Sequence, residues 1–185
     1  MRLRIFLATV AAGFSAPILA DSLDINLNND TVQATYATAW RQAEFNVGFL
    51  DNTDQNDWAA STGLLASGEK QTADMRLDAG LGGRVYYANV SNDNVLALGL
   101  GGQFSVHPNN MPIGFSGYLY YAPDVVTFMD GNKFWEWGAR VEFEMVKKTA
   151  NIYVGYRKML AELDNNNNND VTVDSGVNVG VKISF

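Results

Sequence analysis

The single histidine of this chain, His107, has the most familiar catalytic chemistry of any side chain present. A histidine acts as a general base when a serine or an acidic group lies within hydrogen-bond reach. The residues that follow it, as far as Pro112, are Pro, Asn and Met, and no serine-containing catalytic signature accompanies it. We therefore interpret His107 as a turn residue. We predict no catalytic residue and expect the protein not to be an enzyme.

The run from Asp51 to Asp57 places carboxylate and amide oxygens at close spacing. Ca²⁺ prefers such oxygens, but the run lacks the central glycine and the distal glutamate of a calcium loop. We interpret it as a solvated loop, with weak divalent-cation contact as the alternative. The chain has no cysteine, so it can form neither a thiolate metal site nor a disulfide. The sequence predicts no metal site and no cofactor.

A third group of reactive side chains consists of charges that alternate with apolar residues. In the clearest segment, 135–145, the odd positions are apolar and the even positions are charged or glycine. Five acids and five bases share this inward parity along the chain: Glu44, Arg76, Asp78, Arg84, Glu136, Arg140, Glu142, Glu144, Arg157 and Lys182. Buried charges persist only when they are paired and hydrogen-bonded. We expect a salt-bridged polar interior, with an ion pathway as the alternative.

Only β-strands can place these charges on one face, because successive side chains of a strand point to opposite sides. Alternation predicts strands, each with limits uncertain by about three residues, at 43–50, 57–67, 74–88, 95–106, 113–122, 134–147, 150–162 and 172–185. Eight strands form the smallest common antiparallel transmembrane β-barrel. The expected fold is therefore all-β, with residues 43–185 forming this barrel.

The segment 21–42 alternates in two phases, which are separated by Asn28, Asn29 and Asp30. It is interpreted as an N-terminal periplasmic hairpin or an inserted plug. The alternative is that it supplies two further strands, which would give a ten-stranded barrel. Eight strands are favoured, and ten remain open.

The C-terminus predicts the closing strand of the barrel. Val177, Val179, Val181, Ile183 and Phe185 share one face of this strand. The order of polar residue, glycine, apolar residue and final phenylalanine resembles the signal that the outer-membrane insertion machinery recognises. The residues in its fixed positions are Asn178, Gly180, Ile183 and Phe185. The alternative is the amphipathic last strand of a soluble sheet.

The N-terminus resembles a secretory signal peptide that is cleaved on export. Arg2 and Arg4 precede an apolar stretch and then small residues up to Ala20, so the signal is predicted at 1–20. No other run of about 18 apolar residues is present. The expected location is the outer membrane of a Gram-negative cell.

Loop lengths and aromatic residues indicate the direction of the barrel. If Phe185 lies at the periplasmic end, the polar segments 51–56 and 163–171 fall outside, where long loops are expected. Aromatic residues then form two interfacial levels. Phe49, Trp58, Tyr87, Tyr121 and Trp135 lie at the outer level, while Phe104 and Phe143 are among those at the inner level.

Several motifs along the chain resemble the YfaZ family of predicted outer-membrane proteins. They are the stretch Leu27–Val32, the segment 48–51, the glycine-rich segments 80–84 and 98–103, and the final Phe185. The resemblance runs over essentially the whole mature sequence. It implies an outer-membrane location and a barrel architecture, and it supplies no catalytic motif.

Composition narrows the expected partners. The net charge of −7 excludes the basic footprint of a nucleic-acid-binding protein. We expect a monomer whose partners are the lipid bilayer and lipopolysaccharide, with the outer-membrane assembly machinery acting during biogenesis. A structural or surface-interaction role with a closed lumen is favoured. A narrow channel or small-solute uptake porin is the alternative, and a lipid-modifying enzyme is disfavoured.

Overall fold

The computed structural model describes residues 20–91, 93–163 and 170–185, and these form one continuous antiparallel sheet. The strands are β1 (Ala20–Leu27), β2 (Thr31–Trp40), β3 (Ala43–Asn52), β4 (Asp57–Gln71), β5 (Met75–Val90), β6 (Asp93–Pro108), β7 (Ile113–Ala122), β8 (Thr127–Met129), β9 (Gly131–Val146), β10 (Ala150–Leu163) and β11 (Asp170–Ser184). A short 3₁₀ helix, η1 (Asp124–Val126), precedes β8. The predicted signal peptide lies outside the described residues except for Ala20, whose backbone begins β1.

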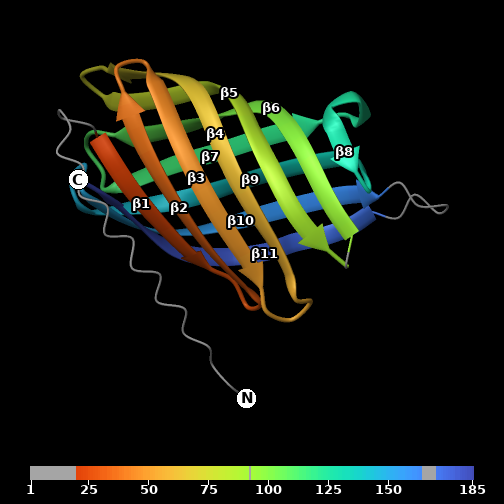
Figure 1. Cartoon of the computed structure of the whole chain (residues 1–185). Helices are drawn as coiled ribbons and strands as arrows, with labels where there is room; N and C mark the ends of the chain where they lie inside the picture. The colour runs from red at the N-terminus through yellow and green to blue at the C-terminus, as the bar shows by residue number, and fades with distance from the viewer. Residues whose placement is uncertain (1–19, 92, 164–169) are drawn as a thin grey trace.

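The sheet closes on itself because β11 pairs with β1 from Ser22↔Ser184 to Leu27↔Val179. Two reciprocal backbone hydrogen bonds between Asp21 and Phe185, of 3.0 and 2.9 Å, complete the seam. Figure 1 shows the strands wrapping round into a barrel, with the C-terminus near the start of β1. A closed barrel leaves no sheet edge without a partner, which a membrane requires.

The barrel wall has ten strands in the described part of the chain, which corrects the preference for eight. Segment 21–42 forms β1 and β2, which are neither a hairpin outside the barrel nor a plug. The phase break at 28–30 is the turn between them, closed by the hydrogen bond from Asn28 N to Thr31 O at 2.9 Å. Without β1 and β2, the edges of β3 and β11 would have no partners. The three-residue β8 pairs with β6 beyond the end of β7 and adds no separate strand to the wall.

The two faces of the wall differ in chemistry as the alternation predicts. Outward residues such as Leu81, Leu100, Val141 and Val177 are apolar and exposed, whereas most inward residues are buried or half-buried. A closed antiparallel barrel with an apolar exterior and a polar interior is the architecture of outer-membrane proteins. Separately, no helix in the described ranges is long and apolar enough to cross a membrane.

The two ends of the barrel carry connections of different character. The turns 41–42, 72–74, 109–112 and 147–149 lie at the end that holds Phe185, which we take as periplasmic. At this end, strands such as β4 and β6 extend beyond their predicted limits. The turns that connect them are therefore shorter than the sequence indicated, as expected for periplasmic turns. The opposite end carries 28–30, 53–56 and the η1–β8 segment. The asparagine-rich loop predicted at 163–171 falls mainly on 164–169, outside the described residues.

The interior is mainly apolar in its outer half, where the polar side chains buried among the described strand ends include Asn52, Asp57 and Thr127. The alternation of charges did not indicate this apolar region. Side chains from eight strands meet there, near the outer strand ends, with at most 3% of their surface exposed: Leu50, Ala59, Ala88, Val90, Val95, Ala97, Ala122, Phe134, Ala161, Leu163 and Val173. The rings of Phe134 and Tyr86 lie 4.5 Å apart at the inner boundary of this layer. We call these eleven residues the apolar layer.

Candidate functional site

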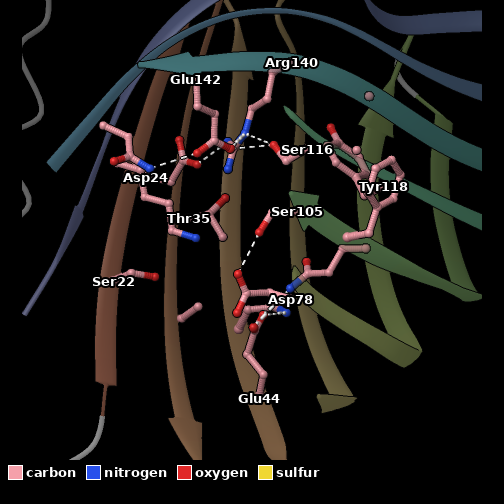
Figure 2. A pocket seen from close by; sticks show the side chains of 18 of the residues that line it. Ser22, Asp24, Thr35, Glu44, Asp78, Ser105, Ser116, Tyr118, Arg140 and Glu142 are labelled. Atoms are coloured by element: carbon pink, nitrogen blue, oxygen red, sulfur yellow. Dashed lines mark hydrogen bonds and ion pairs between the residues drawn. The ribbon is translucent and has the colours of Figure 1, made fainter. Parts of the chain in front are cut away.

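A polar cavity of about 670 Å³ occupies the inner half of the barrel. It extends from Glu136 and Arg157 near mid-height to Arg41 and Lys148 at the periplasmic rim. Figure 2 shows side chains from opposite walls converging in this space. Of the ten charges that the sequence assigned to the lumen, all except Glu144 line the cavity.

Glu136 on β9 is the centre of a buried cluster just below the apolar layer. It accepts hydrogen bonds from the hydroxyls of Tyr86 at 2.7 Å and Tyr118 at 3.0 Å. Arg84 Nη1 lies 3.4 Å from the same carboxylate, and its guanidinium stacks 4.3 Å from the ring centre of Tyr120. This carboxylate therefore has both a cationic partner and neutral donors, as a charge in a dry site requires.

Arg157 on β10 forms a second cluster at a similar height. Its Nε lies 2.5 Å from Asp174 Oδ2, and both side chains are almost fully buried. The guanidinium also donates to Asn26 Oδ1 at 3.0 Å, to Thr31 Oγ1 at 3.1 Å and to Gln33. Since the partners come from β1, β2 and β11 and Arg157 from β10, this cluster ties together four neighbouring strands around the closing seam.

Arg140 on β9 bridges to the first strand lower in the cavity. Its Nη1 lies 2.6 Å from Asp24 Oδ2, and its Nε donates to Glu142 Oε1 and to Ser116 Oγ, each at 2.8 Å. The ring of Tyr153 lies under the guanidinium at 4.3 Å, and its hydroxyl donates to Asp24. Figure 2 shows Asp24 and Arg140 reaching toward each other across the cavity.

The lowest charges are less completely paired. Arg76 Nη2 lies 2.8 Å from Glu144 Oε1, and Arg76 Nε lies 3.8 Å from Asp78 Oδ2. Glu44 accepts hydrogen bonds from Gln103 Nε2 at 2.9 and 3.0 Å, and its nearest partner is therefore a neutral amide. Lys182 lines the cavity without an ion pair to any described residue.

His107 occupies a different position from the turn that the sequence indicated. It lies near the end of β6, opposite Arg76 of β5, and points into the cavity with 5% of its surface exposed. Its Nε2 lies 3.3 Å from Glu142 Oε2, at an angle that makes no hydrogen bond. Ser116 donates to the other oxygen of Glu142 at 2.5 Å. The acid therefore sits between serine and histidine, whereas a nucleophilic triad needs the histidine between serine and acid.

The sequence missed the two acids that balance the central arginines. Asp24 was missed because its segment was not placed in the wall, although its alternation with Leu23 and Ile25 is the signal that could have shown it. Asp174 was hidden by a β-bulge between Met159 and Leu160, which shifts the register of β11 and brings two successive β11 side chains inside. An alternation pattern cannot show which residue a bulge displaces.

The aromatic residues assigned to the interfaces lie on outward positions. Phe49, Trp58 and Tyr87 form a row across three strands, with ring centres 6.1 and 5.5 Å apart. The other members of the set lie on outward positions of β6, β7 and β9, and they are Tyr121, Trp135, Phe104 and Phe143. Their role at the membrane surface stays a prediction.

The residues of the predicted assembly signal divide between the two faces of the seam. Asn178 and Gly180 point inward on β11, while Ile183 and Phe185 point outward. Gly180 lies directly beneath the ring of Tyr153, where a side chain would collide with it. These positions are compatible with the predicted signal, and recognition by the assembly machinery stays a prediction.

The acidic run 51–57 forms a compact turn. Asn52 Oδ1 accepts hydrogen bonds from the backbone amides of Asp54 at 3.1 Å and Gln55 at 3.2 Å. Asp57 Oδ1 accepts one from Ser91 N at 2.9 Å. Two of its polar side chains thus order the connection between strands. Among the described residues, no three His, Cys, Asp or Glu side chains gather closely enough to hold a metal ion.

The chain was compared with curated proteins, with solved structures and with protein-family models. No curated protein matches the chain. The outer membrane channel DcaP of Acinetobacter baumannii is 12% identical over 88% of this chain and 54% of that chain, with a TM-score of 0.35. The NanC porin is 10% identical over 91% of this chain and 100% of that chain, with a TM-score of 0.40. The chain thus spans about half the length of DcaP.

The family model described as YfaZ precursor matches residues 4–185, which include every described strand and the closing Phe185. This chain therefore belongs to the YfaZ family.

Proposed function

We propose that this protein is a non-conducting, non-enzymatic outer-membrane barrel with a structural or surface-interaction role. In this proposal it acts as a monomer whose outward face contacts lipid and whose outer loops contact lipopolysaccharide. The observation that carries the proposal is the apolar layer, which fills the outer half of the lumen with nearly inaccessible side chains. The polar cavity is then a vestibule that begins at the periplasmic rim and ends within the barrel, below the apolar layer.

An ion entering from the periplasm would meet three successive obstacles. The lower lumen holds the ion pairs of Arg76 and Arg140, the clusters of Glu136 and Arg157 lie at mid-height, and the apolar layer follows. Moving an ion into an apolar environment without compensating partners carries a large free-energy penalty. The barrier therefore lies in the outer half of the barrel, where buried side chains fill the interior.

A narrow channel remains the second candidate because the cavity extends to the periplasmic rim. Conduction through the barrel would require the apolar layer to rearrange. Single-channel recording of the refolded protein in planar bilayers separates the two functions. We expect no steady current, whereas a stable current would favour the channel and refute the closed barrel.

Cysteine accessibility tests the apolar layer directly, because the chain has no native cysteine. Ser105→Cys places a thiol in the vestibule, and Ala97→Cys places one in the apolar layer. A small charged thiol reagent should modify the folded Ser105→Cys protein quickly and leave folded Ala97→Cys unmodified until it is denatured. Equally fast reaction at both positions would contradict a closed outer half.

A further inference from the structure

An apolar lobe stands at the outer end of the barrel between β7 and β9. It consists of η1 and β8, and Figure 1 shows it beside the outer ends of the wall strands. Three of its side chains are strongly exposed: Val125 at 79%, Phe128 at 52% and Met129 at 61%. Exposed apolar side chains grouped on one short segment point to an interaction surface.

Strand β8 makes this lobe continuous with the wall of the barrel. It pairs with β6 through Ala97↔Thr127 and Leu96↔Phe128. Thr127 is buried toward the lumen, so Phe128 lies on the lipid-facing side beside Leu96. Leu96 in turn pairs with Tyr87 in the outer aromatic row. Phe128 therefore lies at the same height as that row.

The rest of the lobe is held in a fixed orientation. Thr127 Oγ1 donates to Pro123 O at 3.0 Å, and Val126 packs against the apolar core. Asp130 and Asn94 exchange two hydrogen bonds of 3.0 Å, from the backbone amide of each to an oxygen of the other. Because Val126 is anchored inside, its neighbour Val125 points away from the barrel.

We propose that the η1–β8 lobe is a lateral lipid anchor, in which Val125 and Phe128 insert into the outer leaflet. The occupant is lipid acyl chain, because Phe128 continues the lipid-facing wall beside Leu96, at the height of the outer aromatic row. Aromatic and aliphatic side chains at the membrane interface bury their surface among acyl chains in this way. The inference rests on the membrane location and does not depend on whether the lumen is closed.

Single-cysteine labelling can locate the lobe relative to lipid. Val125→Cys carries an environment-sensitive fluorophore on the lobe, and Asn29→Cys carries it on the exposed β1–β2 turn at the same end. Both proteins are reconstituted into phosphatidylcholine vesicles with and without brominated acyl chains. We expect blue-shifted emission and at least twofold quenching by brominated lipid at position 125, with neither effect at position 29.

Two results would overturn the proposal. Red-shifted, unquenched emission at position 125 would place the lobe in water. Blue-shifted emission without bromolipid quenching would indicate a protein contact, and dependence of that shift on protein density would identify a second copy. Heat-modifiable gel mobility confirms that each labelled protein is folded before measurement. Conductance recorded on the same samples reports separately on the closed lumen.

Discussion

At the scale of single residues, the lumen is organised around four arginines, each contacting at least one carboxylate. Arg84 and Arg140 also stack on tyrosine rings, and Arg157 donates further hydrogen bonds to neutral oxygens. Tyrosines complete the packing by lying over inward glycines, as Tyr118 does over Gly138. The space left by these glycines is therefore occupied by rings from neighbouring strands.

Breaking the Arg157–Asp174 pair should destabilise the barrel strongly. Arg157→Ala leaves a buried carboxylate without its cation, which costs about 3–5 kcal/mol. Replacing both residues, as Arg157→Met with Asp174→Leu, should recover much of that loss because no charge stays buried. Lys133→Ala is the matched control, since its ion pair with Glu162 lies at the surface and should matter far less. Urea unfolding in micelles, followed by tryptophan fluorescence, measures the free energy of unfolding of all three variants. If Arg157→Ala and Lys133→Ala lost the same free energy of unfolding, the buried pair would contribute no more to stability than the surface pair.

At the scale of elements, close approach between neighbouring strands depends on particular glycines. A side chain on Gly101 of β6 would collide with the backbone oxygen of Leu119 on β7, and Gly82 of β5 has the same relation to Leu64 on β4. Glycine permits this approach because it has no Cβ atom. These two positions allow the wall to coil tightly enough to close with ten strands.

Gly101→Val should therefore impair folding, because β6 and β7 could no longer pair in their present register. Gly68→Val is the control, since a Cβ atom at Gly68 of β4 meets nothing within 4 Å. The fraction of heat-modifiable protein after refolding into micelles checks the difference. We expect a severalfold lower yield for Gly101→Val and an unchanged yield for Gly68→Val. Similar yields would mean that strand approach at Gly101 is not limiting.

At the scale of the whole molecule, closure joins the two ends of the described chain. β1 pairs with β11, and the Arg157 cluster links both strands to β2 and β10 through the interior. The first strands are consequently part of the wall and its charge network. Residues far apart in the sequence thus depend on one another for stability.

Excision of residues 21–42 should abolish formation of the barrel. The deletion would leave β3 and β11 with unpaired edges and remove Asp24 from Arg140. Resistance to protease and heat-modifiable mobility report barrel formation. Replacing 123–130 with a short turn is the control, because β7 and β9 remain paired through Ala122↔Phe134. A stable eight-stranded product from the excision would contradict this view of closure.

The sequence by itself determined the longer strands from residue 43 onward and which side chains of each strand share a face. Alternation is a local property, and the 134–147 and 150–162 strands were predicted to within a few residues for that reason. Only the tertiary structure decided that residues 21–42 belong to the wall, that Asp24 and Asp174 pair with lumen arginines, and that the outer half of the lumen is apolar. These features depend on strand number, bulge position and height along the barrel, and those are set by contacts between strands distant in sequence.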